Sequence, residues 1–228
     1  MKARQRLRRW HIWLGWILGL PFLAWTLSGL VMAVRPIETV RGEKLLSPPP
    51  PLPNGFVPVP PAIGPRPAVS LTLDPRPGGP KWIVRYGGGG TRLADPATGR
   101  LLPPLSAADA ARTVEARYTG AARVAAVDRT SRDEPPIELR REIDAWRVTM
   151  SDGTRFYLDA ATGEIVARRT RWWRFYDLMW GIHIMDPLGR ENANNPFEVA
   201  FAALALLTTA LAVVLLPLTI RRRRRLGN

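Results

Sequence analysis

The chain contains two histidines, and each lies where an imidazole could bind a metal ion. His11 stands at the start of a long apolar run, followed at intervals of four residues by Gly15 and Gly19. Residues four apart stack on one face of a helix, so the glycines would form a shallow groove under the imidazole. A flat haem could lie in this groove with His11 as an iron ligand. Alternatively, the glycines form a small-xxx-small helix-packing pattern, and His11 is an interfacial anchor.

The second histidine, His183, lies in the aromatic segment RWWRFYDLMWGIHIMD at residues 171–186. If this segment is a helix, Trp172, Tyr176 and Met179 share the face of His183. Tryptophan and tyrosine favour the membrane interface, because their rings are apolar and their edges donate hydrogen bonds. We therefore expect a helix in the outer headgroup layer. His183 is then either a haem ligand or part of an anchor without chemistry.

The two histidines are predicted on opposite faces of a membrane, roughly 30 Å of hydrocarbon apart, so they cannot bind one iron within a single chain. A homodimer, or another membrane protein, could supply a second histidine at each level. Otherwise each haem would be five-coordinate or would take a sulfur ligand such as Met179 or Met185. The sequence has no phosphate loop, HExxH, GxSxG or zinc-binding spacing, so catalysis by side chains alone is not expected.

Two apolar runs without any charged residue, at 10–34 and 199–220, predict transmembrane helices, since a span needs about 20 apolar residues. The formal net charge is +14, and basic residues cluster in the flanking tails, 1–9 and 221–228. This distribution favours contact with the lipid bilayer and no nucleic-acid binding. The positive-inside rule predicts cytoplasmic termini and places residues 35–195 outside the cytoplasm.

A cleaved secretory signal is the alternative for the first apolar run, because VMA at residues 31–33 loosely resembles a cleavage site. The run is much longer than the 7–15 apolar residues usual for a signal, which favours an uncleaved anchor. The chain has no cysteine, so the external part cannot use disulfides.

Residues 35–67 are predicted to form a proline-rich stalk. Within it, residues 47–67 contain ten prolines in 21 positions. Proline fixes φ and lacks an amide hydrogen, so this segment should be an extended spacer of up to roughly 60 Å. Docking of a proline-binding partner is the alternative.

An internal repeat follows: KWIVRYGGGGTRLADPATGRLL (81–102) matches AWRVTMSDGTRFYLDAATGEIV (145–166). Each copy is predicted as strand, glycine turn, strand, tight turn and strand. In the shared DxxTG motif, Asp accepts amide hydrogen bonds and Gly takes a left-handed conformation. The matched residues are Trp82 and Trp146, Thr91-Arg92 and Thr154-Arg155, Asp95 and Asp159, and Thr98-Gly99 and Thr162-Gly163.

A helix is predicted between the copies at residues 105–120, with Ser106 and Asp109 as a capping box and Gly120 as its stop. Strands are expected after it, and helix followed by antiparallel strands indicates a small α+β unit. The expected strands are residues 122–128, 136–142, 146–150 and 155–159.

The order helix, strand, W-x-V and DGT-x-x-Y-x-DxxTG resembles the PepSY domain, a small extracytoplasmic module of bacteria, over residues 105–170. Residues 68–104 resemble a partial repeat of it. The flanks RRWHIWLGWILGLPFLAWTLSGL (8–30) and FYDLMWGIHIMDPLGR (175–190) resemble PepSY-associated transmembrane proteins, although Ile182 replaces a usual leucine. This resemblance implies an inner-membrane protein with two transmembrane helices flanking an α+β domain. Larger four-helix members include haem-bearing ferric-siderophore reductases, whereas others are inhibitors or binding accessories.

We therefore expect non-enzymatic binding or modulation of an envelope or membrane protein partner. The alternative is transmembrane electron transfer for iron uptake through haem b bound by His11 and His183, in an oligomer that could form through the first span. A secreted inhibitor is disfavoured by the second span. The aromatic interfacial helix at 171–186 and a loop at 187–198 would connect the domain to that span.

Overall fold

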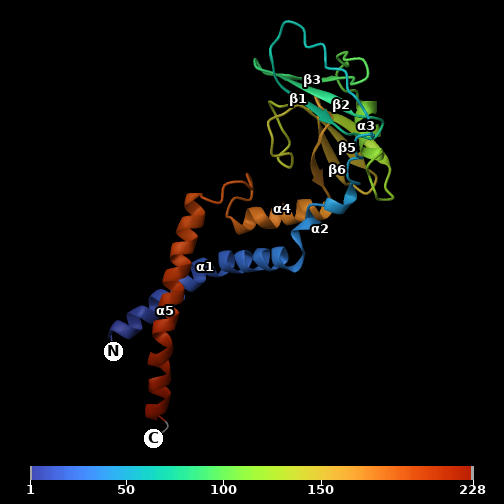
Figure 1. The fold of residues 1–228 in the computed structure, drawn as a ribbon. Coiled ribbons are helices and arrows are strands. Elements are labelled where there is room, and N and C mark those ends of the chain that lie inside the picture. Colours follow the sequence, from blue (N-terminus) through green and yellow to red (C-terminus); the bar gives the residue numbers. More distant parts are fainter. Residues whose placement is uncertain (1, 227–228) are drawn as a thin grey trace. The chain divides into compact units, whose positions relative to one another are not determined.

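The computed structural model describes residues 2–226 and divides the chain into two compact units. One unit holds the residues up to Pro36 together with those from Phe175 onward, and the other is Ile37–Arg174 (Figure 1). The elements are α1 Lys2–Val34, α2 Ile37–Val40, the 3-10 helix η1 Glu43–Leu45, β1 Ala68–Asp74, β2 Lys81–Tyr86, β3 Thr91–Ala94, α3 Ala107–Glu115, β4 Val124–Thr130, β5 Ala145–Met150, β6 Arg155–Asp159, β7 Ile165–Arg169, α4 Arg171–His183 and α5 Pro196–Leu226.

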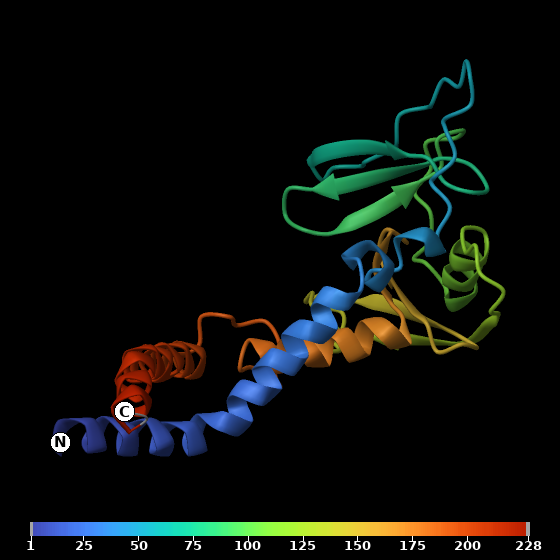
Figure 2. The ribbon, with the colours of Figure 1, turned by 90° about the horizontal axis from the view of Figure 1, so that it is seen from below.

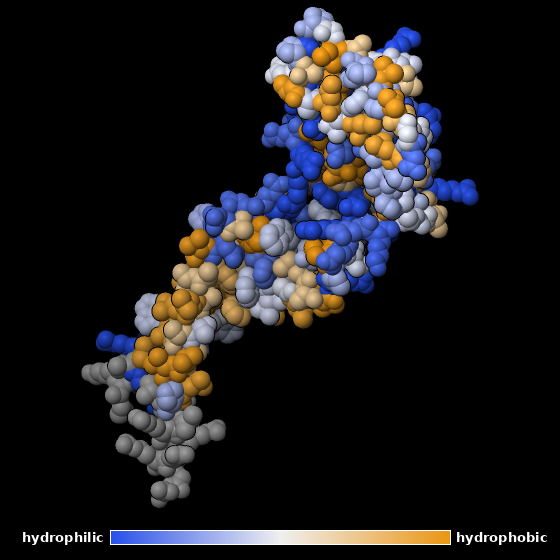
Figure 3. All heavy atoms as spheres, in the orientation of Figure 1, coloured by the Kyte–Doolittle hydropathy of each residue, from blue (hydrophilic) through white to orange (hydrophobic). Residues whose placement is uncertain are grey.

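The helical unit is built on α1 and α5, both long and apolar enough to cross a membrane, over Arg4–Val34 and Pro196–Pro217. Phe201 of α5 packs against Phe22 and Trp25 of α1, with ring centroids 6.2 and 6.3 Å apart. Most other large apolar side chains of these helices are exposed, and Figure 3 shows hydrophobic side chains gathered over α5. Such surfaces suit contact with lipid. The predicted basic side chains at 221–225 lie outside the described side chains.

Helix α1 begins well before the predicted span at 10–34. It includes the basic residues Arg4, Arg6, Arg8 and Arg9. It contains Pro21, and Figure 2 shows the helix bending along its length. Proline removes one backbone hydrogen bond and clashes with the preceding turn, which explains a bend in an otherwise continuous helix.

In the second unit, four antiparallel strands form a sheet in the order β4-β5-β6-β7, with α3 packed on one face. Ala110 and Val114 of α3 are fully buried, as expected from the helical periodicity. They pack on alternate strand residues: Val148, Met150, Phe156 and Leu158. Together, helix and antiparallel strands confirm the predicted α+β class.

The capping box that begins α3 is also confirmed. The Asp109 amide donates to Ser106 Oγ, and the Ser106 amide donates to the Asp109 carboxylate. The Ser106 hydroxyl also donates to the Asp109 carboxylate, and this bond, followed by that from the Ser106 amide, holds the pKa of Asp109 below its ordinary value. The helix ends at Glu115, however, and not at the predicted Gly120.

The opposite face of the four-stranded sheet is covered by the loop at residues 131–144. Leu139 from this loop packs with Ala145, Tyr157 and Ala167. The predicted strand at 136–142 is wrong: the segment turns, and the Leu139 amide donates to the Pro136 carbonyl. Two consecutive prolines lack the amide hydrogens that a strand ladder needs, which favours a turn.

A smaller antiparallel sheet, in the order β1-β2-β3, repeats this arrangement. Its strand β1 bears the same relation to β2 as β4 does to β5. In both pairs the register shifts near the start of the first strand, at Ala68/Ser70 and at Val124/Ala126. We call β1–β3 the first repeat and β4–β7 the second repeat. The structural repeat thus includes β1, which precedes the matched letters at 81–102 and lies within the predicted partial repeat at 68–104.

The DxxTG turns have the predicted chemistry in both repeats. Asp95 Oδ1 accepts from the Ala97 amide at 2.9 Å, and Asp159 Oδ1 accepts from the Ala161 amide at 2.9 Å. Gly99 and Gly163 have φ of 71° and 70°, the left-handed region that glycine adopts without a steric cost.

One predicted match is displaced. The strand register places Thr91 opposite Arg85 and Arg155 opposite Thr149, so Thr91 occupies the position of Arg155. The Thr-Arg pairs of the two repeats are therefore out of step by one residue. Because the two hairpin loops have the same length, Thr91 and Thr154 are not structurally equivalent, although both begin a Thr-Arg pair.

The proline-rich segment, residues 47–67, is hydrogen-bonded at its start and near its middle to other parts of the second unit. The Ser47 amide donates to the Arg117 carbonyl at 2.7 Å, and the Val59 amide donates to the Pro96 carbonyl at 2.7 Å. Ile63 packs on the core of Val84 and other residues of the first repeat. These contacts do not fit a freestanding spacer.

The proline-rich segment also occupies the place that the start of α3 has in the second repeat. Trp82 Nε1 donates to the Val59 carbonyl at 2.8 Å, and Trp146 Nε1 donates to the Leu105 carbonyl at 3.0 Å. Each repeat therefore fixes its equivalent tryptophan to the chain segment that covers that face of its sheet.

Candidate functional site

His183, the last residue of α4, packs against α1 in the helical unit. Its imidazole stacks on the indole of Trp25, with centroids 4.7 Å apart and planes inclined by 14°. Its Nδ1 lies 3.0 Å from the Trp25 carbonyl oxygen and 3.2 Å from Ser28 Oγ. The structure thus gives His183 a defined socket on the neighbouring helix.

The socket selects one tautomer of His183. A carbonyl oxygen can only accept, so Nδ1 must carry the proton that it donates to Trp25. The hydroxyl of Ser28 donates to the same carbonyl at 2.8 Å, which leaves its oxygen lone pairs to accept from Nδ1. In the neutral imidazole, Nε2 is then the nitrogen that carries the lone pair, and it has no polar partner among the described residues.

Gly29 completes the socket because it leaves space for the imidazole edge. A Cβ at this position would lie 2.9 Å from Cε1 of His183, closer than carbon atoms approach without displacement. Sequence reasoning missed Trp25, Ser28 and Gly29. Their spacing of three and four residues places them on one helix face, which was the available signal.

His11, Gly15 and Gly19 are not brought to this socket. A Cβ added at either glycine would meet nothing within 4 Å, so in the described structure their helix face is open. Nδ1 of His11 is buried without a hydrogen-bond partner among the described residues. His11 lies 17 positions before Ser28, which on a helix is about 25 Å of rise.

These positions do not fit a haem held by both histidines of one chain. The rise along α1 keeps the two imidazoles far beyond the distance that one iron can bridge. No group of three or more His, Cys, Asp or Glu side chains suited to a metal ion occurs within residues 2–226. A six-coordinate haem at either level would need a second ligand, from another chain or from a methionine sulfur.

The loop from α4 to α5 is held by its own polar side chains. Asp177, buried on α4, pairs with Arg190 at 3.1 Å. Asn195 caps α5 by accepting from the Glu198 amide at 2.9 Å. Asp186 accepts from several backbone amides, Asn192 first, and these bonds lower its pKa. Helix α4 ends at His183, three residues before the end predicted for the helix at 171–186.

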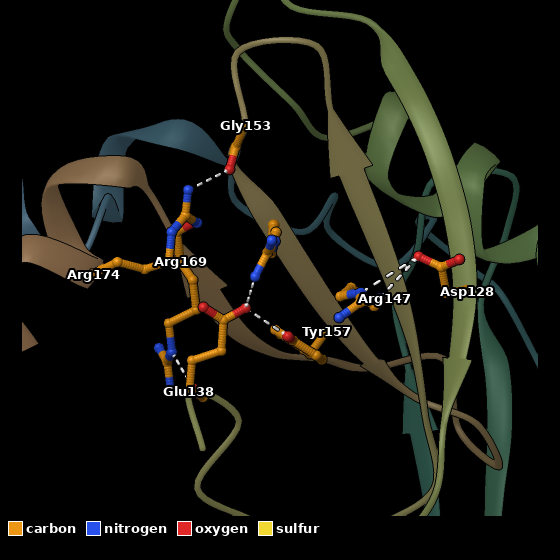
Figure 4. Close-up of polar contacts among 8 residues, drawn as sticks. Asp128, Glu138, Arg147, Gly153, Tyr157, Arg169 and Arg174 are labelled. Atoms are coloured by element: carbon orange, nitrogen blue, oxygen red, sulfur yellow. Dashed lines mark hydrogen bonds and ion pairs between the residues drawn. The ribbon is translucent and has the colours of Figure 1, made fainter. Parts of the chain in front are cut away.

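The second unit contains a buried carboxylate that sequence analysis did not single out. Glu138, on the loop at 131–144, accepts from the Tyr157 hydroxyl at 2.6 Å and from Arg155 Nη1 at 3.0 Å (Figure 4). Arg169 Nε donates to the Glu138 carbonyl oxygen. Burial, then the hydrogen bond to Glu138 and its negative charge, raise the pKa of Tyr157 strongly. The network fixes the loop on the sheet.

A single residue, Thr170, separates β7 from α4. Its hydroxyl accepts from the Trp173 amide at 2.8 Å and so caps the helix. The Arg169 guanidinium lies 4.0 Å above the Trp173 ring, and Arg174 Nη2 donates to the Gly153 carbonyl at 3.0 Å, as Figure 4 shows for the latter pair. The first turn of α4 is therefore fixed to the sheet.

A cleft of about 1040 Å³ lies within the second unit, between the first repeat and the outer side of α3. Arg76, in the β1–β2 connection, closes one part of it: Nε donates to Asp74 at 2.6 Å, and Nη1 donates to the Thr162 carbonyl. The first repeat thus packs directly on the DxxTG turn of the second. Sequence analysis left this packing open.

The two apolar helices and the α+β unit between them define a membrane protein with an extracytoplasmic domain. The PepSY family model, described as "Peptidase propeptide and YPEB domain", matches residues 104–169. The chain therefore contains a PepSY domain, formed by α3 and the second repeat, and the predicted resemblance is confirmed for this segment. No curated protein and no solved structure matches the chain.

Proposed function

We propose that the chain is a bacterial inner-membrane protein whose PepSY domain binds or modulates an envelope partner without catalysing a reaction. The observation that supports this most is the attachment of the domain. The second unit, which contains the domain, is joined to α1 through residues 35–36, and the last strand of the domain is joined to α4 through Thr170. In the proposed topology, connections this short favour partners that are themselves close to the membrane.

The proposed topology places both termini in the cytoplasm and residues 35–195 outside it. The basic clusters beside each span support this orientation. Because the chain has no cysteine, single introduced cysteines report it cleanly. A cysteine at Ala97 should react with a membrane-impermeant maleimide in intact spheroplasts, and one at Gln5 should react only after lysis. The reverse pattern would refute the orientation.

Partner binding is tested by photo-crosslinking in living cells. A photoreactive amino acid placed at exposed positions of the domain, such as Ala126, should give discrete adducts with one recurrent protein. The matched control is the same residue at Leu20, which is exposed on the apolar surface of α1. Domain positions that give no protein adduct, or the same adducts as Leu20, would refute the proposal.

Electron transfer through haem b remains the second candidate function, and the His183 socket is the observation in its favour. Histidines that ligate a metal commonly donate their other nitrogen to a carbonyl, which fixes the tautomer. His183 makes this bond to Trp25, which assigns the lone pair of the neutral imidazole to Nε2. A second chain or partner would supply the further ligand. Haem absorbance that disappears in His183→Ala would support this function, and protein expressed with haem precursor but lacking a Soret band would exclude it.

A further inference from the structure

The two repeats differ in how one face of each sheet is covered. In the second repeat, the face opposite α3 is covered by the loop at 131–144, which connects β4 to β5. In the first repeat, the corresponding connection is residues 75–80, which is too short to fold back over its sheet. The equivalent face of the first repeat borders the cleft instead.

The covering loop shows what such a face accommodates. It presents a carboxylate, Glu138, to cationic and hydroxyl donors on the strands, and it packs Leu139 against Ala145, Tyr157 and Ala167. The loop contains Pro135 and Pro136 and forms neither helix nor strand. A chain segment without regular structure, carrying an acidic and an aliphatic side chain, is therefore the internal precedent.

The cleft face of the first repeat offers the complementary chemistry. Successive strand residues alternate between faces, so Lys81, Ile83 and Arg85 of β2 point to the cleft while Trp82 and Val84 form the core. Ile83 and Leu93 form an apolar floor. The side chains of Lys81 and Arg85 have no hydrogen-bond or ion-pair partner among the described residues.

When the two repeats are aligned by strand register, Lys81 and Arg85 fall near the position at which the second repeat binds the Glu138 carboxylate. Arg85 is paired across the strands with Thr91, and Thr91 occupies the position of Arg155, the residue that binds Glu138. Leu93 occupies the position of Tyr157. Where the second repeat has a buried hydrogen-bonding site, the first repeat therefore has an apolar floor with cations beside it.

The opposite wall of the cleft sets a second requirement. It carries Glu115 on α3 and Glu164 in the β6–β7 turn, and neither side chain has a partner among the described residues. The cations on this wall are already engaged, since Arg112 pairs with Asp109 and Arg117 donates to the Ser47 carbonyl. An occupant should therefore place its carboxylate toward β2, where Lys81 and Arg85 have no such partner in the part of the chain that the structure describes.

We propose that this cleft binds a peptide segment of the envelope partner in an irregular, turning conformation like that of the loop at 131–144. A carboxylate side chain of the segment lies against Lys81 and Arg85, and an aliphatic side chain lies over Ile83 and Leu93. This inference rests on the proposed binding function and names the site and the chemistry recognised. The cleft volume of about 1040 Å³ is at the upper end of ligand sites, enough for a short peptide.

A suitable probe is a fluorescein-labelled peptide with the sequence EPPIELRREI, residues 134–143 of the chain. In the protein this sequence is part of the loop that covers the second repeat. Fluorescence anisotropy with the full chain in detergent should show saturable binding. The double variant Lys81→Gln/Arg85→Gln should weaken binding at least about tenfold, or 1.4 kcal/mol, and Lys81→Glu/Arg85→Glu should weaken it further. The matched control is Arg100→Glu, because Arg100 is exposed on the same repeat and lies outside the cleft. This variant should bind the peptide as tightly as the wild type does.

A peptide carrying Glu138→Gln should bind the wild-type chain more weakly than the parent peptide. Absence of saturable binding to the wild-type chain would overturn the proposal, as would equal binding by the cleft and control variants. Photo-crosslinking of the partner in cleft variants distinguishes failure of the cleft proposal from failure of the proposed binding function. Adducts that persist in Lys81→Gln/Arg85→Gln would refute the cleft while partner binding stands, whereas adducts lost there and retained in Arg100→Glu would support it.

Discussion

Replacing Tyr157 by phenylalanine isolates one bond of the buried network without changing the packing of the ring. The hydroxyl donates to Glu138 at 2.6 Å, and both residues are buried. A hydrogen bond to a charged group contributes about 1.5–3 kcal/mol. We therefore expect Tyr157→Phe to lower the free energy of unfolding of the second unit by about 2 kcal/mol.

The pH dependence provides a sharper measurement. In the unfolded chain Tyr157 ionises near its ordinary pKa of 10.0, whereas burial and the Glu138 carboxylate keep it protonated in the fold. The unfolded state therefore binds fewer protons above this pH, and the stabilisation is present below it and lost as pH rises. The difference between wild type and Tyr157→Phe should shrink by about 1.4 kcal/mol per pH unit above that point.

Pulse proteolysis of the full chain in detergent and urea, with fragments of the second unit quantified by mass spectrometry, measures this difference. Tyr86→Phe is the matched control, because Tyr86 is buried in the first repeat and its hydroxyl has no partner among the described residues. The reasoning would be refuted if both variants were equally stable, or if the Tyr157→Phe difference were unchanged across the alkaline range.

Three further predictions concern other contacts. Gly29→Ala should lower the melting temperature of the helical unit, measured by circular dichroism in detergent, because its Cβ would lie 2.9 Å from His183; Gly15→Ala, with open space around it, should not. Ser106→Ala should destabilise the domain by about 1 kcal/mol through loss of the capping box, and an unchanged urea midpoint would contradict this. Trp173→Ala should raise hydrogen exchange in the first turn of α4, through loss of a cation–π contact of about 0.5–2 kcal/mol; exchange equal to wild type would refute the role of that contact.

Local patterns predicted the elements that depend on local chemistry. The capping box at Ser106, the turn at Asp159 and the strand at 155–159 follow from short-range rules and are confirmed. The two apolar helices and the α+β class follow from hydropathy and alternation.

The parts that could not be predicted depend on contacts between distant segments. Composition indicated a spacer at 47–67, but a tryptophan of the first repeat binds its backbone. The segment at 136–142 has an alternating pattern, yet it supplies Glu138 to a neighbouring sheet. The His183 socket requires α1 and α4 to meet over 155 positions of sequence. No local periodicity encodes these pairings.

Only residues 35–36 separate α1 from α2, and only Thr170 separates β7 from α4. Two extended residues span at most about 7 Å, so neither connection is a long linker. In the proposed topology, a partner would therefore have to bind the domain close to the membrane surface. Proteins of the same membrane, or proteins bound to its surface, are the first candidates for that partner.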